Sequence, residues 1–206
     1  RVKNVREFRL SCPSPDTNHY ADKPTFPVRL RYYSEDRINP ALALPKVSSQ
    51  NRRYIPMEVI DADVIAGSKL FLIPDISLYH FGVLTSNVHM AWMRTVCGRL
   101  KSDYSYASNV VYNTFPWPEP TAQQRQKIEQ TAQAILDARA LYPDSSLADL
   151  YDELTMPPEL RKAHRQNDMA VMQAYGFTKG SEAYKSEAAC VAELMQRYQK
   201  LCEEQK

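Results

Sequence analysis

Segment 46–54 combines side-chain types that bind nucleic acid. It carries three positive charges, four short polar side chains and one aromatic ring, and it has no acidic residue. Lys and Arg neutralise phosphates, Arg pairs with a guanine edge, Asn and Gln pair with adenine, and Ser donates to phosphate or base. This mixture predicts a nucleic-acid-contacting loop with the members Lys46, Ser48, Ser49, Gln50, Asn51, Arg52, Arg53 and Tyr54. A solvated basic loop without a ligand is the alternative interpretation.

A second basic and aromatic group lies further along the chain. Its members are Arg99, Lys101, Ser102, Tyr104 and Tyr106. If 100–106 is one strand, alternation places Lys101 on the face opposite Tyr104 and Tyr106. Arg94, on the helix expected before it, can reach the same surface. The prediction is nucleic-acid contact by Arg99, Lys101, Ser102 and Tyr104, and the alternative is a sheet edge whose charges prevent aggregation.

Charge is distributed unevenly along the chain, although the formal total is only +2. Residues 1–120 carry fifteen Lys and Arg against eleven Asp and Glu, and residues 121–206 carry eleven against thirteen. This asymmetry fits a basic first part and is also small enough to arise by chance. The N-terminal Arg1, Lys3, Arg6 and Arg9 can border a DNA groove or contact an upstream domain. Because the chain starts without Met in structured-looking sequence, we expect a piece of a longer protein.

Patterns for several enzyme classes are absent from the sequence. No GxG follows a predicted strand and no Gly-rich Lys-Ser/Thr loop occurs, so no cofactor or phosphate cradle is expected. Met156-Pro-Pro-Glu159 lacks the Asn amide and aromatic ring that hold a flipped adenine, and is interpreted as a helix stop and start. His89 and Cys97 are about 12 Å apart along one helix, too far for a thiol–base pair. We predict no catalytic residue in this chain.

Metal, disulfide and membrane features are not expected either. Asp61, Asp63 and Asp75 are interpreted as turn residues rather than metal ligands. The four cysteines form no CxxC pair, so reduced thiols of a cytoplasmic protein fit better than a zinc site or a disulfide framework. No apolar run approaches the roughly 18 residues that cross a membrane, and no signal peptide is apparent.

Strands and one helix must position the candidate contacts. Ser86 can cap a helix that Gly98 ends, with Val88, Trp92 and Val96 in one buried stripe. Runs of β-branched and aromatic residues bounded by turn formers predict strands at 1–10, 28–33, 54–59, 64–66, 70–73, 79–84 and 110–112.

Prolines divide the chain into two parts. Eleven of fourteen precede residue 121, and Pro116, Pro118 and Pro120 alternate at the boundary. The first part, with proline-containing loops at 11–27 and 34–53, reads as a mixed β-rich domain with an embedded helix. The second reads as a small all-α domain with predicted helices at 121–142, 145–154, 158–175 and from 181 onward. The predicted fold class is therefore α+β.

Six short motifs in this order resemble a known family. They are Val47-Ser-Ser, Arg52-Arg-Tyr-Ile-Pro56, Leu78-Tyr-His-Phe-Gly82, His89-Met-Ala-Trp-Met-Arg94, Gly98-Arg-Leu-Lys-Ser-Asp-Tyr104 and Tyr112-Asn-Thr-Phe-Pro-Trp-Pro118. Together they resemble the specificity region of MmeI-like type IIL restriction-modification proteins. In that family one polypeptide carries a nuclease, an adenine-N6 methyltransferase, a target recognition domain and a C-terminal helical domain.

The resemblance implies a role for each part of the chain. Residues 1–117 would be the target recognition domain and 118–206 the C-terminal helical domain. The chain would recognise a short duplex DNA sequence and position it for a catalytic domain outside the fragment, with base-reading side chains around 48–54 and 99–106. Its partners would be double-stranded DNA and the upstream methyltransferase domain, with S-adenosylmethionine bound by the parent protein and no cofactor by this part. The alternative function is a non-catalytic protein-docking module.

Overall fold

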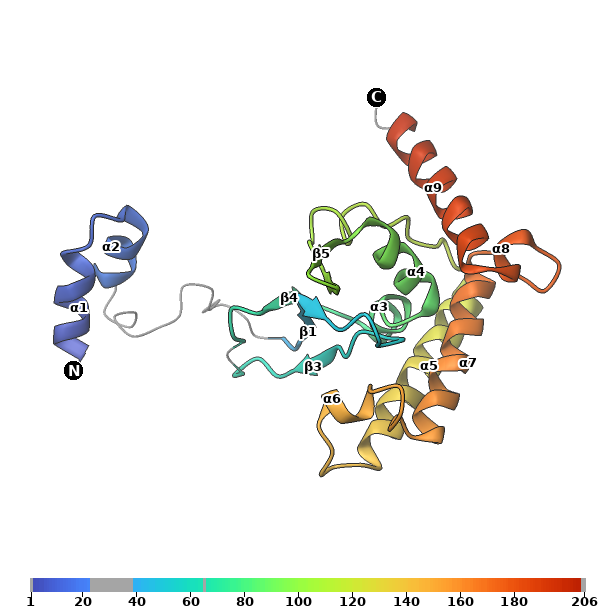
Figure 1. The fold of residues 1–206 in the computed structure, drawn as a ribbon, viewed down its shortest axis with the longest axis horizontal. Helices are drawn as coiled ribbons and strands as arrows, with labels where there is room; N and C mark the ends of the chain where they lie inside the picture. The colour runs from blue at the N-terminus through green and yellow to red at the C-terminus, as the bar shows by residue number, and fades with distance from the viewer. Residues whose placement is uncertain (1, 23–38, 65, 205–206) are drawn as a thin grey trace.

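The computed structural model describes residues 2–22, 39–64 and 66–204 (Figure 1). The helices are α1 Val2–Leu10, α2 Pro15–Asp22, α3 Leu78–Leu84, α4 Asn87–Val96, α5 Ala122–Ala140, α6 Leu147–Leu150, α7 Pro158–Ala174, α8 Glu182–Lys185 and α9 Glu187–Glu204. The strands are β1 Ala41–Pro45, β2 Val47–Ser48, β3 Glu58–Ile60, β4 Leu70–Pro74, β5 Gly98–Leu100 and β6 Asp103–Ser105. This mixture of helices and small sheets confirms the predicted α+β class.

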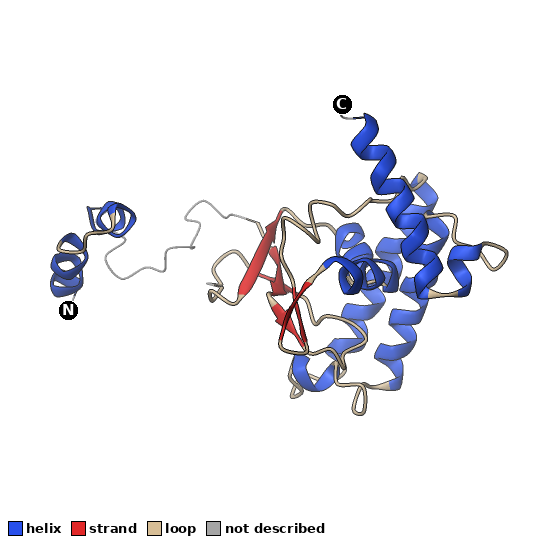
Figure 2. Ribbon diagram, turned by 45° about the horizontal axis from the view of Figure 1, so that its top comes forward, coloured by secondary structure: helices blue, strands red, loops and turns tan. Residues whose placement is uncertain are grey.

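Two antiparallel three-stranded sheets lie against the helices (Figure 2). One has the order β3-β1-β4, with Leu42 of β1 opposite Val59 and Ile73. The other has the order β2-β6-β5, with Tyr104 of β6 opposite Ser48 and Arg99. Leu42 and Leu44 of the first sheet and Tyr104 of the second belong to the same buried cluster as the helices. The helices thus supply the core on which both sheets rest.

Two segments predicted as strands are helices. In the segment predicted at 1–10, residues 2–10 form α1, where apolar residues recur every three positions and Lys3 pairs with Glu7 one turn later. Segment 79–84 lies in α3, at whose start the Ser77 N–H donates to His80 Nδ1 at 3.4 Å. A short continuous apolar run has no periodicity of its own that separates a buried helix from a buried strand. Burial against α5 selects the helix here.

The remaining strand predictions have mixed outcomes. The prediction at 70–73 is confirmed by β4, and that at 54–59 is largely wrong because β3 begins only at Glu58. Segment 110–112 is a turn, and 64 and 66 are outside any strand. The predicted loops are wrong where 34–53 contains β1 and β2 and where 11–27 contains α2. The strand predicted at 28–33 lies outside the described residues.

Local capping signals predicted the later helices well. Ser86 Oγ accepts from the backbone N–H of His89 at 3.4 Å and starts α4, although the helix ends at Val96, before Gly98. The Thr121–Gln124 capping box starts α5. Gly176, with φ 77°, follows α7 as expected of a C-terminal stop. The predicted 145–154 helix shrinks to α6, and the helix predicted from 181 is interrupted at Ser186, which separates α8 from α9.

A buried amide ties three helices together. Asn167 of α7 donates through Nδ2 to the carbonyl of Gly82 in α3 at 2.7 Å. Its Oδ1 accepts from the Thr131 hydroxyl of α5 at 3.1 Å. Gly82 permits this approach, because a Cβ there would lie 2.7 Å from Ile128 Cγ2 and 3.0 Å from Asn167 Oδ1. The core therefore continues across the proline boundary, from α3 into α5 and α7.

We expect Gly82→Ala to lower the free energy of unfolding by about 1–3 kcal/mol through overpacking. A Gly→Ala change inside a helix normally gains about 1 kcal/mol, so the sign of the effect distinguishes packing from propensity. Urea unfolding measures it. Gly180→Ala is the control, since no atom lies within 4 Å of a Cβ there. A more stable Gly82→Ala chain would contradict the close approach.

The burial of His89 predicts loss of stability in acid. Complete burial lowers its pKa from the usual 6.5 to about 4, so the folded chain holds a neutral ring where the unfolded chain takes up a proton. The free energy of unfolding should therefore fall as pH drops from 6.5 towards 4, by about 1.4 kcal/mol per unit for one such group. His164, whose pKa burial lowers, acts in the same direction, and Asp168, whose pKa burial raises to about 6, acts in the opposite one.

Comparison with His89→Gln isolates this contribution. Unfolding of both proteins by urea at several pH values should give a pH slope that is smaller in the variant by about one proton. The same slope in both proteins would show that His89 titrates normally.

Candidate nucleic-acid interface

The chain crosses from one sheet to the other at Lys46. β1 ends at Pro45 and β2 begins at Val47. Between them, the Lys46 N–H donates to the Lys69 carbonyl at 2.9 Å, and the Lys46 carbonyl accepts from the Tyr106 N–H at 2.8 Å. The backbone at this residue is therefore held from both sides, and it fixes the direction in which the following loop leaves β2.

The loop after β2 is a compact turn with exposed polar side chains. The Arg52 N–H donates to the Ser49 carbonyl at 3.1 Å, and the Asn51 N–H donates to Ser49 Oγ at 3.3 Å. The Gln50 N–H donates to Asp103 Oδ1 at 3.3 Å, which links the loop to β6. The side chains of Gln50, Asn51 and Arg53 are exposed, and those of Ser49 and Arg52 are half-buried.

Segment 100–106 is not one strand, because it contains the last residue of β5, a turn and the whole of β6. Leu100 of β5 pairs with Asp103 of β6, so Lys101 and Ser102 form a two-residue turn. Lys101 has φ 56°, in the left-handed region, which is costly for a residue with a Cβ. The prediction that Lys101 lies on a strand face is therefore wrong. Lys101 and Ser102 are exposed at the tip of the hairpin.

Arg99 lies across the hairpin from Tyr104. Its guanidinium sits 4.2 Å from the centre of the Tyr104 ring and donates to the Ser102 carbonyl at 3.0 Å. The face of an aromatic ring attracts a guanidinium and holds it in place. The remaining N–H groups of the guanidinium stay available as hydrogen-bond donors. Because β6 pairs with both β2 and β5, the structure brings the two predicted groups together on one three-stranded sheet.

Tyr54 fastens the end of the loop to the helices. Its ring stacks on His164 of α7 with centroids 4.1 Å apart. Its hydroxyl donates to Asp168 Oδ2 at 2.7 Å and accepts from Arg53 Nε at 3.2 Å. Burial raises the pKa of the Tyr54 hydroxyl, which therefore stays protonated and keeps donating. The other Asp168 oxygen accepts from the Asn87 N–H at 2.7 Å, at the start of α4.

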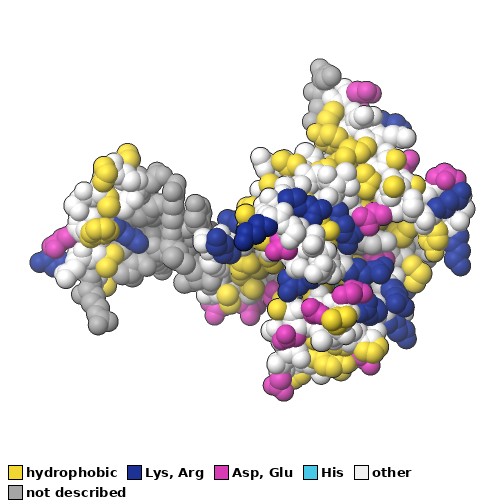
Figure 3. Space-filling model, viewed as in Figure 1, with side chains coloured by type: hydrophobic (Ala, Val, Ile, Leu, Met, Phe, Trp, Pro, Cys, Tyr) yellow, Lys and Arg dark blue, Asp and Glu magenta, His cyan; other side chains and the backbone are white. Residues whose placement is uncertain are grey.

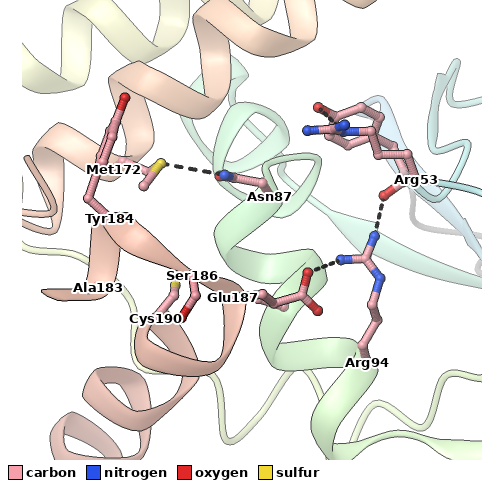
Figure 4. Close-up of a pocket in the computed structure, with 11 residues that line it drawn as sticks. Arg53, Asn87, Arg94, Met172, Ala183, Tyr184, Ser186, Glu187 and Cys190 are labelled. Carbon is pink, nitrogen blue, oxygen red and sulfur yellow. Dashed lines mark hydrogen bonds and ion pairs between the residues drawn. The ribbon is translucent and has the colours of Figure 1, made fainter. Parts of the chain in front are cut away.

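Arg94 of α4 reaches the end of the 49–53 loop, whereas the sequence suggested that it would share the surface of the Arg99–Tyr106 group. One end of its guanidinium donates to the Arg53 carbonyl at 2.7 Å and the other pairs with Glu187 of α9 at 3.0 Å (Figure 4). These contacts line a cavity of about 350 Å³ between the loop end, α4 and the α8–α9 junction, with Asn87 and Cys190 on its wall. Arg94 is thus a link between loop and helices, with both ends of its guanidinium occupied by protein groups.

The twelve candidate contact residues fall into two sets. Ser48, Tyr54 and Tyr104 are buried, with exposed fractions of 3%, 1% and 7%. Their side chains point into the protein and support the loop and hairpin. The others are at least partly exposed; they are Lys46, Ser49, Gln50, Asn51, Arg52, Arg53, Arg99, Lys101 and Ser102. Lys46 also covers the Phe71 ring, with Nζ 4.7 Å from its centre.

Sequence reasoning did not identify three residues on which this geometry depends. Asp103 joins the hairpin to the loop, and its position directly after Ser102 in the turn was the available signal. His164 and Asp168 lie more than a hundred residues from Tyr54, and nothing in the local pattern of α7 indicates that they hold it. Only the fold reveals this contact.

Other classes of site find no support in residues 2–22, 39–64 and 66–204. In these ranges no three His, Cys, Asp or Glu side chains are grouped so that they could bind a metal ion. No helix among them is both long and apolar enough to span a membrane. The pKa of the Cys97 thiol is raised by burial, which disfavours the nucleophilic thiolate.

Comparison with known proteins gives consistent matches. Residues 1–119 match the family model described as MmeI, target recognition domain, and residues 120–205 match that described as MmeI, C-terminal domain. DNA methyltransferase A of Bacillus subtilis (strain 168) is 38% identical over 170 residues, which are 82% of this chain and 19% of that protein. The chain thus spans about a fifth of the length of this curated relative.

A solved structure matches almost the whole chain. It is described as the type IIL restriction-modification enzyme MmeI in complex with DNA, and it is 42% identical to this chain. The match has a TM-score of 0.84 and covers 98% of this chain and 26% of that one. At this identity and coverage the chain agrees with that structure in both sequence and fold. The two family models together match residues 1–205. The chain therefore belongs to the MmeI family, of which it comprises the target recognition domain and the C-terminal domain.

Proposed function

We propose that this chain reads the target sequence in duplex DNA for a restriction-modification methyltransferase. The observation that carries the proposal is the meeting of the 49–53 loop and the β5–β6 hairpin on one sheet. The two segments present cations, amides and hydroxyls together, and their one carboxylate, Asp103, is engaged by the Gln50 N–H. The relative solved in complex with DNA supports DNA as the ligand.

The hairpin suits entry into a major groove. A two-stranded ribbon fits the groove, which is about 12 Å wide and displays a distinct pattern for every base pair. The turn at Lys101 and Ser102 would enter the groove first. Arg99, whose guanidinium lies over the Tyr104 ring, would follow it. Left-handed backbone at a residue with a Cβ, as at Lys101, is a form of strain that collects at functional sites.

The side chains divide into readers and positioning groups. We assign base reading to Gln50, Asn51, Arg99 and Ser102, whose amide, guanidinium and hydroxyl groups match base edges. We assign phosphate contacts to Lys46, Ser49, Arg52, Arg53 and Lys101. Ser48, Tyr54 and Tyr104 hold these groups in place from the protein interior.

The remaining activities belong to the longer protein that we propose contains this chain. A methyltransferase domain upstream would transfer the methyl group of S-adenosylmethionine to adenine N6 in a type IIL system of the cytoplasm. The name of the B. subtilis relative supports the methyltransferase. We place the cofactor outside this chain because none of its five glycines forms a GxG. Within the chain we propose that recognition occupies 1–117 and the helical domain 118–206.

One observation favours a docking role beside recognition. α1 has no buried residue, and Val2 and Phe8 are 52% and 69% exposed. In the described part of the chain α1 contacts α2, and the pair lies apart from the main body (Figure 1). Two short helices are marginal in water without a surface to cover their apolar side. We propose that this surface is the upstream methyltransferase domain.

Removal of phosphate contacts should change the salt dependence of DNA binding. Arg52→Gln with Lys101→Gln removes two cations and should lower the slope of log affinity against log salt by about 1.8, or 0.9 for each phosphate. Fluorescence anisotropy of the full-length protein with labelled duplex, over a series of KCl concentrations, measures the slope. Lys179→Gln with Lys200→Gln is the matched control, because both lysines are exposed outside the loop and hairpin. Equal slopes in all three proteins would disprove these phosphate contacts.

Removal of the amides should change selectivity instead. Gln50→Ala with Asn51→Ala should relax base preference at one or two positions of the target, at about 1–3 kcal/mol for each lost pair of hydrogen bonds, with little change in salt slope. Selection of bound duplexes from a randomised library, followed by sequencing, gives the preference of each protein. An unchanged target with unchanged affinity would remove these two residues from the reading surface.

A further inference from the structure

One side of α7 continues the surface of the recognition loop. Arg161, Arg165, Asp168 and Met172 recur at helical spacing and lie on this side. Asp168 accepts from the Tyr54 hydroxyl at the end of the loop, and Met172 Sδ accepts from Asn87 Nδ2 at the start of α4. The direction of this side is therefore fixed by contacts at its C-terminal half. Its N-terminal half, with the two arginines, extends past the loop.

Arg53 forms the bridge between the loop and these arginines. It lies close enough to Asp168 and Glu153 to interact with both carboxylates electrostatically. Glu153 in turn pairs with Arg161, with Nη1 and Oε1 2.7 Å apart, and the Arg161 guanidinium also donates to the Glu153 carbonyl at 2.9 Å. Arg165, between Arg161 and Asp168 on the helix, is exposed.

The carboxylates near this part of α7 already have partners. Glu153 is held by Arg161, and Glu159 accepts from the Tyr142 hydroxyl at 2.9 Å. Asp168 is buried beneath Tyr54. Among the described residues Lys162 and Arg165 have no carboxylate partner, and both are exposed. Their positive charge therefore remains uncompensated at the surface.

Arg165 lies on the same side of α7 as Asp168, and Lys162 is its neighbour one turn earlier on the helix surface. Figure 3 shows Lys and Arg side chains gathered near the β2-β6-β5 sheet and again near α7, on the same side of the molecule. Side chains three positions apart on a helix lie about 5–6 Å apart at Cβ, so the Lys162 and Arg165 head groups can reach neighbouring phosphates of one strand. A line of cations beyond the base-reading groups is what a duplex backbone requires.

We propose that Lys162 and Arg165 bind backbone phosphates of the duplex on the flank of the sequence read by the loop and hairpin. The helical domain is then a second DNA-contacting element, which adds affinity and register without sequence information. This inference rests on the proposed DNA recognition and extends it to a surface of the C-terminal domain.

The test compares three forms of the full-length protein: wild type, Lys162→Gln with Arg165→Gln, and the control Lys179→Gln with Lys200→Gln. Affinity for a duplex with the selected target and for an unrelated duplex is measured by anisotropy between 50 and 200 mM KCl. In the α7 variant we expect a salt slope smaller by about 1.8. The factor by which 200 mM KCl weakens binding relative to 50 mM should then be about tenfold smaller in the variant than in the wild type. Affinity for target and unrelated duplex should fall by the same factor, and the selected sequence should stay the same.

The outcomes separate the two proposals. An α7 variant with the slope of the wild type, or one no different from the control, overturns the α7 contact while DNA recognition by the loop and hairpin stands. A changed target sequence also overturns it, since phosphate contacts carry no base information. Wild type without salt-dependent DNA binding overturns both. A second readout is duplex length: trimming the flank that contacts α7 should weaken the wild type and leave the variant unaffected.

Discussion

One buried carboxylate holds the end of the 49–53 loop to the rest of the molecule. Both oxygens of Asp168 are used, one by the Tyr54 hydroxyl and the other by the N–H that begins α4. Burial raises its pKa to about 6, which shows how costly its charge is in this place, and Arg53 and the two donors offset part of that cost. An unpaired carboxylate there would destabilise the fold, so the loop end, α4 and α7 keep one relative arrangement. The end of the 49–53 loop is therefore held in place by the bonds to Asp168.

The candidate surface combines exposed side chains with buried ones that support them. Ser48 is buried between exposed Val47 and half-buried Ser49, and Tyr104 is buried while its cross-strand partner Arg99 is exposed. The buried members fix the backbone, and the exposed ones carry the charges and amides. Exposed side chains of this kind can be replaced at little cost in stability, because surface changes away from caps and networks are usually worth less than about 0.5 kcal/mol.

Sequence reasoning succeeded where the determining interaction is local. The caps at Ser86 and Thr121 are short-range hydrogen bonds written in neighbouring residues, and the helices that follow them were predicted correctly. It failed at α3, where the apolar run fits either structure and the decision comes from Gly82 lying against Ile128. It failed again for β1, since flanking prolines suggested a loop although Leu42 and Leu44 are fully buried.

The candidate site shows the same division. Residue types and their order pointed to both candidate segments, because clusters of cations, amides and hydroxyls are visible in the sequence. Which members face outward was not visible, since it depends on pairing between β2 and β6 and on the Tyr54–His164 stack. The arginines of α7 received no role from the sequence.

Contacts across the proline exit argue that the two matched regions fold as one unit. Asn167 binds the carbonyl of Gly82, and Arg139 of α5 donates to the carbonyl of Met57 at 2.8 Å. Tyr79 donates to the Pro118 carbonyl at 3.2 Å, which holds the exit itself against α3. Each of these bonds is buried, and the loss of one partner leaves a desolvated polar group that costs about 1–3 kcal/mol. The helices therefore complete the core of the recognition domain, and α7 holds the end of the 49–53 loop through the bond between Asp168 and Tyr54.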